Sequence, residues 1–397
     1  MASLDLEAAF AKVLETWVPQ NQASLAQAAR RLSERWVSVD TTVADDAFLE
    51  PLVVAWLTSP ARRPALRSLL LPTLASDQRA QEVSTIADRD GVVELPGLGI
   101  FAGNAPGEEL ELCWLGSGRV SVRSSASGLD REVILRPLPV VPGTRAVLAR
   151  CAHPLLERFY TDADGNCLTV ETSAASRSHA AEAARAFALL ERSVPVLHAH
   201  LATAVRRVTI HQGGTVNSFA TPAAHGAVFL AATADDGEVG LAEDLVHQGG
   251  HVLFTAITAD RSVFFKVPPD TPVSAITGAS ADSETRNLNE ALHGFFTEAA
   301  MILFLHRLLD LEGLTVRQAH EALGRLAFIS SRTTGDLAEL SRPGLFTEHG
   351  LGILRLCRSA LAETIECRRA QLVSLDLSDQ PYAFSYGIFT ARNPLVR

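Results

Sequence analysis

The spacing of apolar residues changes twice along the chain and divides the sequence into three regions. Residues 1–89 repeat apolar positions at intervals of three and four, as in 5–18 and 23–36, which predicts a helical N-terminal region. Residues 90–175 contain short, often alternating apolar runs between clusters of Gly, Pro, Ser and Asn, which predicts a small, mostly antiparallel sheet. Residues 176–397 return mainly to the helical interval. The predicted fold class is therefore α+β, with a helical C-terminus.

The third region combines two strands with a series of helices. Its pattern predicts an Ala-rich helix over 176–202 and strands over 206–211 and 226–232. Two strongly apolar helices follow, over 240–255 and 286–311. Further helices are predicted over 315–330, 335–340 and 347–373.

The composition favours a globular protein of a reducing compartment. The formal net charge is −10 and no basic cluster is present, which argues against nucleic acid or an anionic membrane surface as a partner. No apolar run is long enough to span a membrane, and the N-terminus lacks the pattern of a signal peptide. The five cysteines are scattered, without a Cys-x-x-Cys pair. We expect a cytoplasmic location, and the sequence does not indicate the oligomeric state.

The helix over 240–255 contains a histidine pair with the spacing of a metal site. His247 and His251 lie one turn apart, so both imidazoles occupy the same helix face and can reach one ion. Gln248 stands at the catalytic position of this motif, where His-Glu-x-x-His has Glu. The two glycines that follow it, 249–250, indicate either close helix packing or room for a ligand.

A third metal ligand is expected from the helix over 286–311. His293 is the first choice, followed by Glu290 and then Glu298, because His-x-x-x-His sites are usually completed from a following helix. This predicts a zincin-like metal-binding helix pair. The alternative is that these histidines are ordinary core or surface residues.

Gln248 decides between two kinds of metal chemistry. A zinc protease uses the motif Glu as general base, and a neutral amide cannot take that proton, so hydrolysis would need another carboxylate such as Glu243 or Glu290. An iron oxygenase needs no such base, but it needs open coordination positions and a cation for its cosubstrate. Arg286 precedes His293 by about two helical turns, roughly 10 Å along the axis, which suits that role. The alternative is a solvated surface arginine.

Residues 226–294 resemble the HExxH-type 2-oxoglutarate-dependent peptide β-hydroxylases, which modify ribosomally made peptide natural products. The matching segments are 226–230, 242–247, His251, Arg286, Leu288 and 292–294. The resemblance implies that His247, His251 and His293 bind Fe(II). It also implies that Arg286 contacts the cosubstrate 2-oxoglutarate. The sequence departs from the family pattern at Gln248, at 249–250 and at Asn287, which replaces Pro.

These observations predict an Fe(II)/2-oxoglutarate-dependent oxygenase that uses O2 to hydroxylate, or otherwise oxidise, a side chain of a ribosomally synthesised precursor peptide. The alternatives are a zincin-type metallohydrolase, active or degenerate, and a non-catalytic peptide-binding protein. The strand over 226–232 precedes the metal helix, as the edge strand does in zincin-like folds, and a peptide substrate could add to it as an extra strand. His225, at its start, is expected to be a turn residue rather than a fourth ligand.

Overall fold

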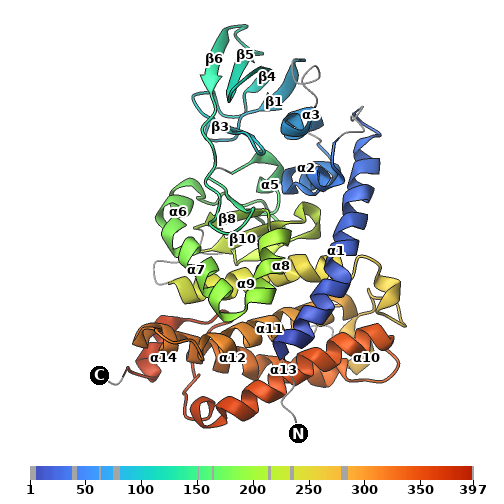
Figure 1. The fold of residues 1–397 in the computed structure, drawn as a ribbon, viewed down its shortest axis with the longest axis vertical. Helices are drawn as coiled ribbons and strands as arrows, with labels where there is room; N and C mark the ends of the chain where they lie inside the picture. The colour runs from blue at the N-terminus through green and yellow to red at the C-terminus, as the bar shows by residue number, and fades with distance from the viewer. Residues whose placement is uncertain are drawn as a thin grey trace. The chain divides into compact units, whose positions relative to one another are not determined.

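The computed structural model has an α+β fold, as predicted (Figure 1). It describes residues 6–37, 43–61, 64–74, 81–150, 152–162, 165–212, 216–232, 237–278 and 285–395. The chain divides into two compact units, each assembled from separate stretches of sequence. We call them the helical unit (Met1–Pro19, Glu182–Leu201 and Thr233–Arg397) and the sheet unit (Gln20–Ala181 and Ala202–Ala232). The three regions of the sequence, 1–89, 90–175 and 176–397, are shared between these two units.

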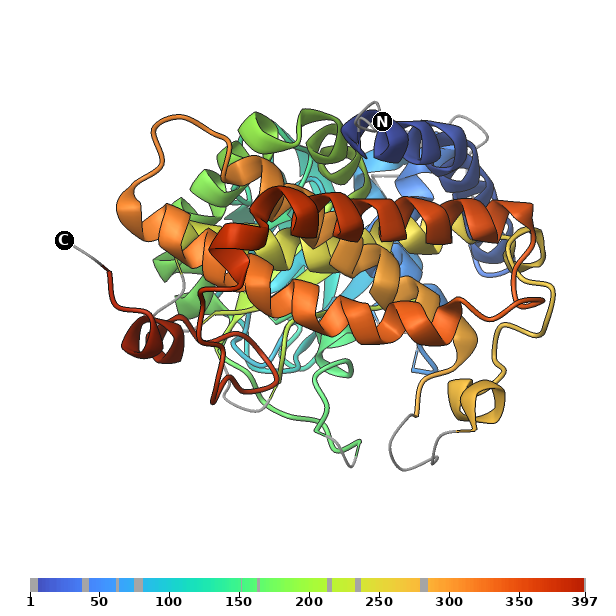
Figure 2. The same cartoon turned by 90° about the horizontal axis from the view of Figure 1, so that it is seen from below.

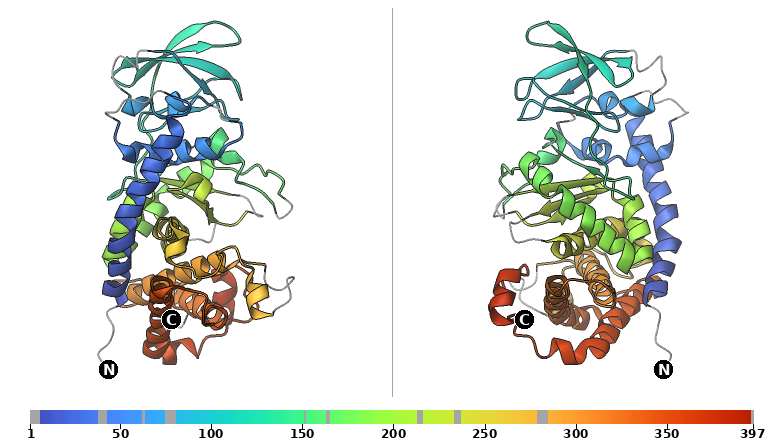
Figure 3. Two further views of the ribbon diagram at one scale, coloured as in Figure 1. Left: turned by 90° about the vertical axis from the view of Figure 1, so that its right-hand side faces the viewer. Right: turned by 60° about the vertical axis from the view of Figure 1, so that its left-hand side comes forward.

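The first sheet of the sheet unit is antiparallel throughout, as predicted for residues 90–175, but its strand β1 lies within residues 1–89, where only helices were predicted. Its strands occur in the order β1-β4-β5-β6, and Figure 3 shows β4 to β6 in teal. Their bounds are β1 (Val83–Ile86), β4 (Glu109–Gly116), β5 (Arg119–Ser124) and β6 (Asp130–Ile134). Ser117 and Gly118 form the turn between β4 and β5, and both have positive φ (51° and 72°). This is the backbone that a two-residue hairpin turn requires, and glycine adopts it without strain.

The second sheet is mainly parallel, in the order β7-β8-β10-β9. Strand β8 pairs parallel with both β7 and β10, whereas β9 pairs antiparallel with β10. The bounds are β7 (Val147–Leu148), β8 (Arg207–His211), β9 (Phe219–Ala220) and β10 (Ala227–Ala231). The strand predicted over 226–232 is therefore not an edge strand, and the expected peptide addition to it is wrong. Its continuous apolar run is typical of a strand buried on both faces.

The sheet unit has one hydrophobic core that joins its short helices to its sheets. The core includes Leu52 of α2, Leu112 of β4, Val122 of β5 and Phe229 of β10. Strands β2 and β3 pair antiparallel, and their residues Val93, Leu95 and Phe101 belong to this core. The remaining bounds are η1 (Asp45–Leu49), α2 (Pro51–Thr58), α3 (Leu66–Leu69), η2 (Leu71–Thr73), β2 (Val93–Leu95), β3 (Gly99–Phe101), α5 (Pro154–Glu157), α6 (Ser173–Ser178) and η3 (Pro222–Ala224).

The helical unit is built around α11, which contacts α9, α12 and α13. Helix α11 is buried on nearly every face, as expected of a helix that is apolar all round. Figure 2 shows α12 and α13, coloured orange to red, side by side. The long helices are α9 (Glu238–Ile257), α11 (Leu288–Leu308), α12 (Val316–Leu340) and α13 (Glu348–Leu372). The shorter ones are η4 (Arg261–Val263), α10 (Val273–Thr277) and α14 (Tyr386–Arg392).

Three more helices, α1 (Leu6–Ser33), α7 (Ala180–Ser193) and α8 (Pro195–Ala204), contribute residues to both units. Within the described ranges, no helix combines the length and apolar character that a membrane crossing requires. The cysteines Cys113, Cys167, Cys357 and Cys367 are free thiols, and Cys151 lies outside the described residues.

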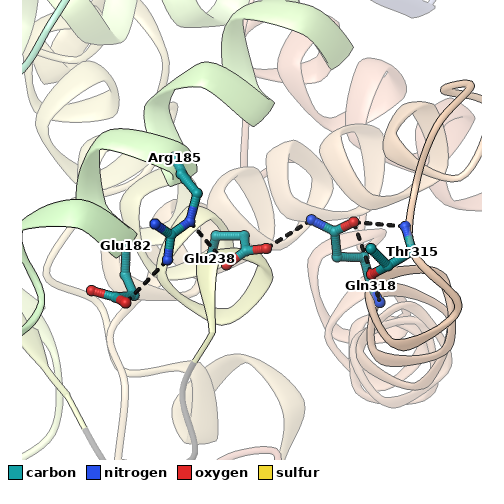
Figure 4. A network of polar contacts seen from close by, with 5 residues as sticks. All are labelled: Glu182, Arg185, Glu238, Thr315 and Gln318. Carbon is teal, nitrogen blue, oxygen red and sulfur yellow. Dashed lines mark hydrogen bonds and ion pairs between the residues drawn. The ribbon is translucent and has the colours of Figure 1, made fainter.

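A polar network fixes the start of α9 against α12 (Figure 4). Arg185 of α7 bonds Glu182 at 3.0 Å and Glu238 of α9 at 3.4 Å. The other carboxylate oxygen of Glu238 accepts a hydrogen bond of 2.7 Å from Gln318 of α12. Gln318 is itself held by Thr315, since the two residues form a capping box at the start of α12. The network therefore aligns the first turns of α9 and α12.

Candidate functional site

The structure brings His247, His251 and His293 together from two packed helices. The ring centroids of His247 and His251 are 4.9 Å apart on α9, and those of His251 and His293 of α11 are 4.4 Å apart. All three side chains are partly exposed, although most of α9 is buried. We call these three residues the histidine cluster. Its formation follows the helical spacing and the predicted pairing of the two helices.

Close packing of α9 on α11 explains one of the two central glycines. A Cβ atom at Gly250 would lie 3.1 Å from Cγ2 of Thr297 on α11, closer than a side chain normally comes. Glycine therefore lets the helix backbones approach at the level of the cluster. For Gly250, the structure supports the packing interpretation of the motif.

Burial keeps the histidine cluster neutral. It lowers the pKa of His247 to about 3, of His251 to about 4 and of His293 to about 3, and the mutual repulsion of the rings adds to the shift at His247 and His293. Near neutral pH each ring therefore keeps a nitrogen lone pair, which is the form that binds metals.

The orientation of His293 does not complete a metal site. Its Nε2 lies 3.1 Å from the backbone carbonyl oxygen of His251, and its ring packs 4.7 Å from that of Phe254. Over the part of the chain that the structure describes, no group of three or more His, Cys, Asp or Glu side chains is placed to hold a metal ion. The residue types and their proximity fit a three-histidine site. The ring orientation does not, because metal binding by Nε2 requires His293 to leave that carbonyl.

The two carboxylates considered as substitute bases are both engaged. Glu243, one turn before His247, forms a buried ion pair with Arg325 of α12. Arg325 also bonds Glu321 at 3.0 Å. Glu290 accepts a hydrogen bond of 2.9 Å from the backbone N–H of Asn287, as part of the capping box that begins α11. Neither carboxylate is in a position typical of a general base.

Gln248 does not take the role of the general base that stands at its position in His-Glu-x-x-His. Gln248 is 2% exposed, and its Oε1 is without a hydrogen-bond partner among the described residues. Its amide cannot accept the proton that the motif Glu would take.

The charge of Glu298 acts on the buried Cys357 of α13, whose pKa is raised first by burial and then by this carboxylate. Glu298 is not part of any metal-binding group among the residues that the structure describes.

Arg286 lies just before α11 and not on the helix predicted over 286–311, because the helix begins at Leu288 after the N-cap Asn287. Its Nη1 atom would be 4.0 Å from a Cβ atom at Gly294, the residue that follows His293. The backbone carbonyl of Arg286 accepts a hydrogen bond of 3.0 Å from Val273, which anchors this segment beside α10. The guanidinium therefore runs along the first turns of α11.

His225 belongs to the sheet unit and has its own contact there. Its Nε2 lies 3.1 Å from Nε2 of Gln22, and burial lowers its pKa to about 4. It precedes Gly226, whose φ of 91° starts the turn into β10. This agrees with its interpretation as a turn residue.

Two arginines of α12, Arg325 and Arg332, were not singled out from the sequence. The signal that indicates them is the spacing of charges along α12: Glu321 and Arg325 form an i, i+4 pair, and Arg332 follows two turns after Arg325. No protein-family model matches the chain, and no curated protein matches it. The case for function therefore rests on the residues themselves.

Proposed function

We propose that this protein is an Fe(II)/2-oxoglutarate-dependent oxygenase that oxidises a side chain of a ribosomally synthesised precursor peptide. The observation that carries the proposal is the packing of three neutral imidazoles from two helices, with ring centroids 4.9 Å apart for His247 and His251 and 4.4 Å apart for His251 and His293. Arg286 lies near Gly294, the residue after His293. Neutral histidines and an adjacent arginine are the parts that an iron site with a dicarboxylate cosubstrate needs.

The same geometry disfavours hydrolysis. A zinc hydrolase needs a carboxylate that accepts a proton from the attacking water. Gln248 cannot supply it, Glu243 is neutralised by Arg325, and Glu290 caps α11. An oxygenase does not require this base, so the proposal agrees with all three residues.

His247, His251 and His293 would hold the iron, and Arg286 would pair with the distal carboxylate of 2-oxoglutarate. Bound iron supplies the activation of O2, which protein side chains alone do not provide. Binding requires the His293 ring to turn away from the carbonyl of His251. That reorientation is part of the proposal, and we derive no reaction step through the metal.

The contact between His293 and the carbonyl of His251 favours one alternative function, a peptide-binding protein without catalysis. In that case the three rings form a packed polar cluster and take up no metal. The two functions therefore differ in whether the protein takes up a metal ion, which can be measured directly.

Anaerobic titration with Fe(II) and then 2-oxoglutarate tests the proposal. We expect one iron per chain and a weak visible charge-transfer band when 2-oxoglutarate is added. His293→Ala should abolish both signals, whereas the control His349→Ala, at an exposed position of α13, should keep them. Absence of iron uptake by the wild-type protein would favour the peptide-binding function. Zinc-dependent peptide cleavage would instead favour a hydrolase.

A further inference from the structure

Two arginines two turns apart on α12 are held in different ways. Arg325 is buried and bonded to two carboxylates, Glu243 and Glu321. Arg332 is exposed and pairs with no carboxylate in the described part of the chain. Arg325 is therefore neutralised within the protein, whereas the charge of Arg332 is available to a ligand.

The register of α9 and α12 places His247 and Arg332 in the same direction along the two helices from the ion pair of Glu243 and Arg325. Glu238 of α9 meets Gln318 of α12 at 2.7 Å, and Glu243 meets Arg325 further along both helices. The helices therefore run in the same direction at this contact. The next residue on that face of α9 is His247, one turn after Glu243, and Arg332 lies two turns after Arg325.

The guanidinium of Arg332 is fixed in position. It lies 4.6 Å from the ring centroid of Tyr382 and 5.6 Å from that of Phe328. Its Nη1 donates a hydrogen bond of 2.7 Å to the carbonyl of Tyr382. Its other N–H groups have no protein acceptor within the described ranges. Aromatic rings thus hold the cation while leaving N–H groups for a carboxylate.

The C-terminal segment that contains Tyr382 is anchored on α12, although the side chain of Tyr382 is itself exposed. Phe389 of α14 is completely buried against Gly324, where an added Cβ atom would lie 2.6 Å from the phenylalanine ring. Phe384 packs 5.8 Å from Phe328, between Tyr382 and that anchor in the sequence. The position of Arg332 therefore depends on the docked C-terminal segment.

We infer that Arg332 binds a carboxylate of the substrate peptide, an Asp or Glu side chain close to the residue that is oxidised. This inference rests on the proposed function for the identity of the substrate, but the binding itself needs no iron. Arg286 lies near Gly294 of α11, and Arg332 lies on α12 two turns after Arg325, whose partner Glu243 is one turn before His247, so the cosubstrate and the substrate each have a separate cation. A guanidinium and a carboxylate form two parallel hydrogen bonds, which would fix the register of the peptide.

Titration of the metal-free protein with N-acetyl-aspartate methylamide, followed by NMR of the histidine ring signals, tests this inference. The wild-type protein should show a saturable shift of the His247 signals, and the matched asparagine compound should not cause one. Arg332→Gln should weaken binding by about tenfold or more, as expected for a charged hydrogen-bonded pair. Arg332→Lys should keep part of the affinity, because it retains the charge without the planar fork.

Arg317→Gln provides the matched control. Arg317 also lies on α12 and stacks on an aromatic ring of the C-terminal segment, 5.1 Å from that of Tyr386. Its replacement should leave binding of the aspartate compound unchanged. Equal binding by Arg332→Gln and wild type, equal loss in Arg317→Gln, or no saturable shift in the wild-type protein would overturn the inference. Because iron is absent, these results are independent of whether the protein is an oxygenase.

Discussion

Both units bury neutral histidines, but they use them differently. In the sheet unit, burial lowers the pKa of His153 to about 3 and of His225 to about 4. Each has a local contact: Nδ1 of His153 accepts a hydrogen bond of 3.2 Å from Leu155 at the start of α5, and His225 meets Gln22. In the helical unit, the ring of His251 lies between those of His247 and His293.

The comparison shows that a lowered pKa does not by itself identify a functional site. Burial produces the same shift in both units, including at a residue that caps a short helix. What distinguishes the histidine cluster is the convergence of partly exposed rings from two helices, next to cations that come from other segments. The predictions that follow test this difference, starting with the largest effect.

The largest effect is expected at the buried ion pair of the sheet unit. Arg207 and Glu94 are each 1% exposed and form a two-pronged pair, and burial raises the pKa of the nearby Glu50. Arg207→Met should reduce the free energy of unfolding by about 3–5 kcal/mol, because it leaves buried carboxylates without their cation. Urea denaturation measures this loss. The double variant Arg207→Met/Glu94→Leu should recover much of it, and no recovery would contradict the explanation.

The contact between α9 and α11 should be the most sensitive point of the histidine cluster. Gly250→Val adds a branched side chain where a Cβ atom already lies 3.1 Å from Cγ2 of Thr297. We expect a loss of about 2 kcal/mol from overpacking, together with weaker iron uptake. Thr297→Ser removes Cγ2 and keeps the hydroxyl that donates to Gly294, so it should partly rescue the valine variant. Unchanged stability in Gly250→Val would show that the helices do not meet this closely.

Acid titration should show that the buried His153 of the sheet unit makes stability depend on pH. The folded pKa of His153 is about 3, against about 6.5 when unfolded, so the unfolded chain binds the proton first. Its contribution to stability is complete above pH 6.5 and is lost as the pH falls towards 3. His153→Asn keeps a capping acceptor and should reduce the slope of unfolding free energy against pH by about 1.4 kcal/mol per unit. Urea denaturation at pH 5, 6 and 7 measures this slope, and an unchanged slope would argue against a neutral buried His153.

The sequence predicted which residues share one helix face better than it predicted contacts between separate helices or strands. Helical spacing was sufficient to place His247 and His251 on one face of α9, and the apolar pattern located α11. The orientation of His293 could not be predicted, because it depends on a carbonyl of another helix. The pairing of β10 was also non-local, and the edge prediction failed when β9 was found beside it.

The sequence did not indicate Arg332 as a binding residue because the predicted helix ended before it. The predicted helix ended at residue 330, because Ser330 to Gly335 contains residues with low helix propensity. The structure continues α12 to Leu340. Tertiary packing overrides the local preference, since Thr333 is completely buried and its hydroxyl donates to the carbonyl of Ile329. Arg332 therefore gains a defined place on a helix that the sequence pattern did not extend that far.

The smallest effect is expected at Tyr382, whose ring covers the guanidinium of Arg332. Tyr382→Leu removes a cation–π contact of about 0.5–1 kcal/mol at an exposed position and keeps the backbone carbonyl that accepts from Arg332. We expect roughly two- to fivefold weaker binding of N-acetyl-aspartate methylamide, because the cation is less well held. Tyr382→Phe keeps the ring and should bind like the wild type. A loss in Tyr382→Leu as large as that in Arg332→Gln would show that the C-terminal segment contacts the ligand itself. Equal binding by all three proteins would mean that Arg332 needs no aromatic support.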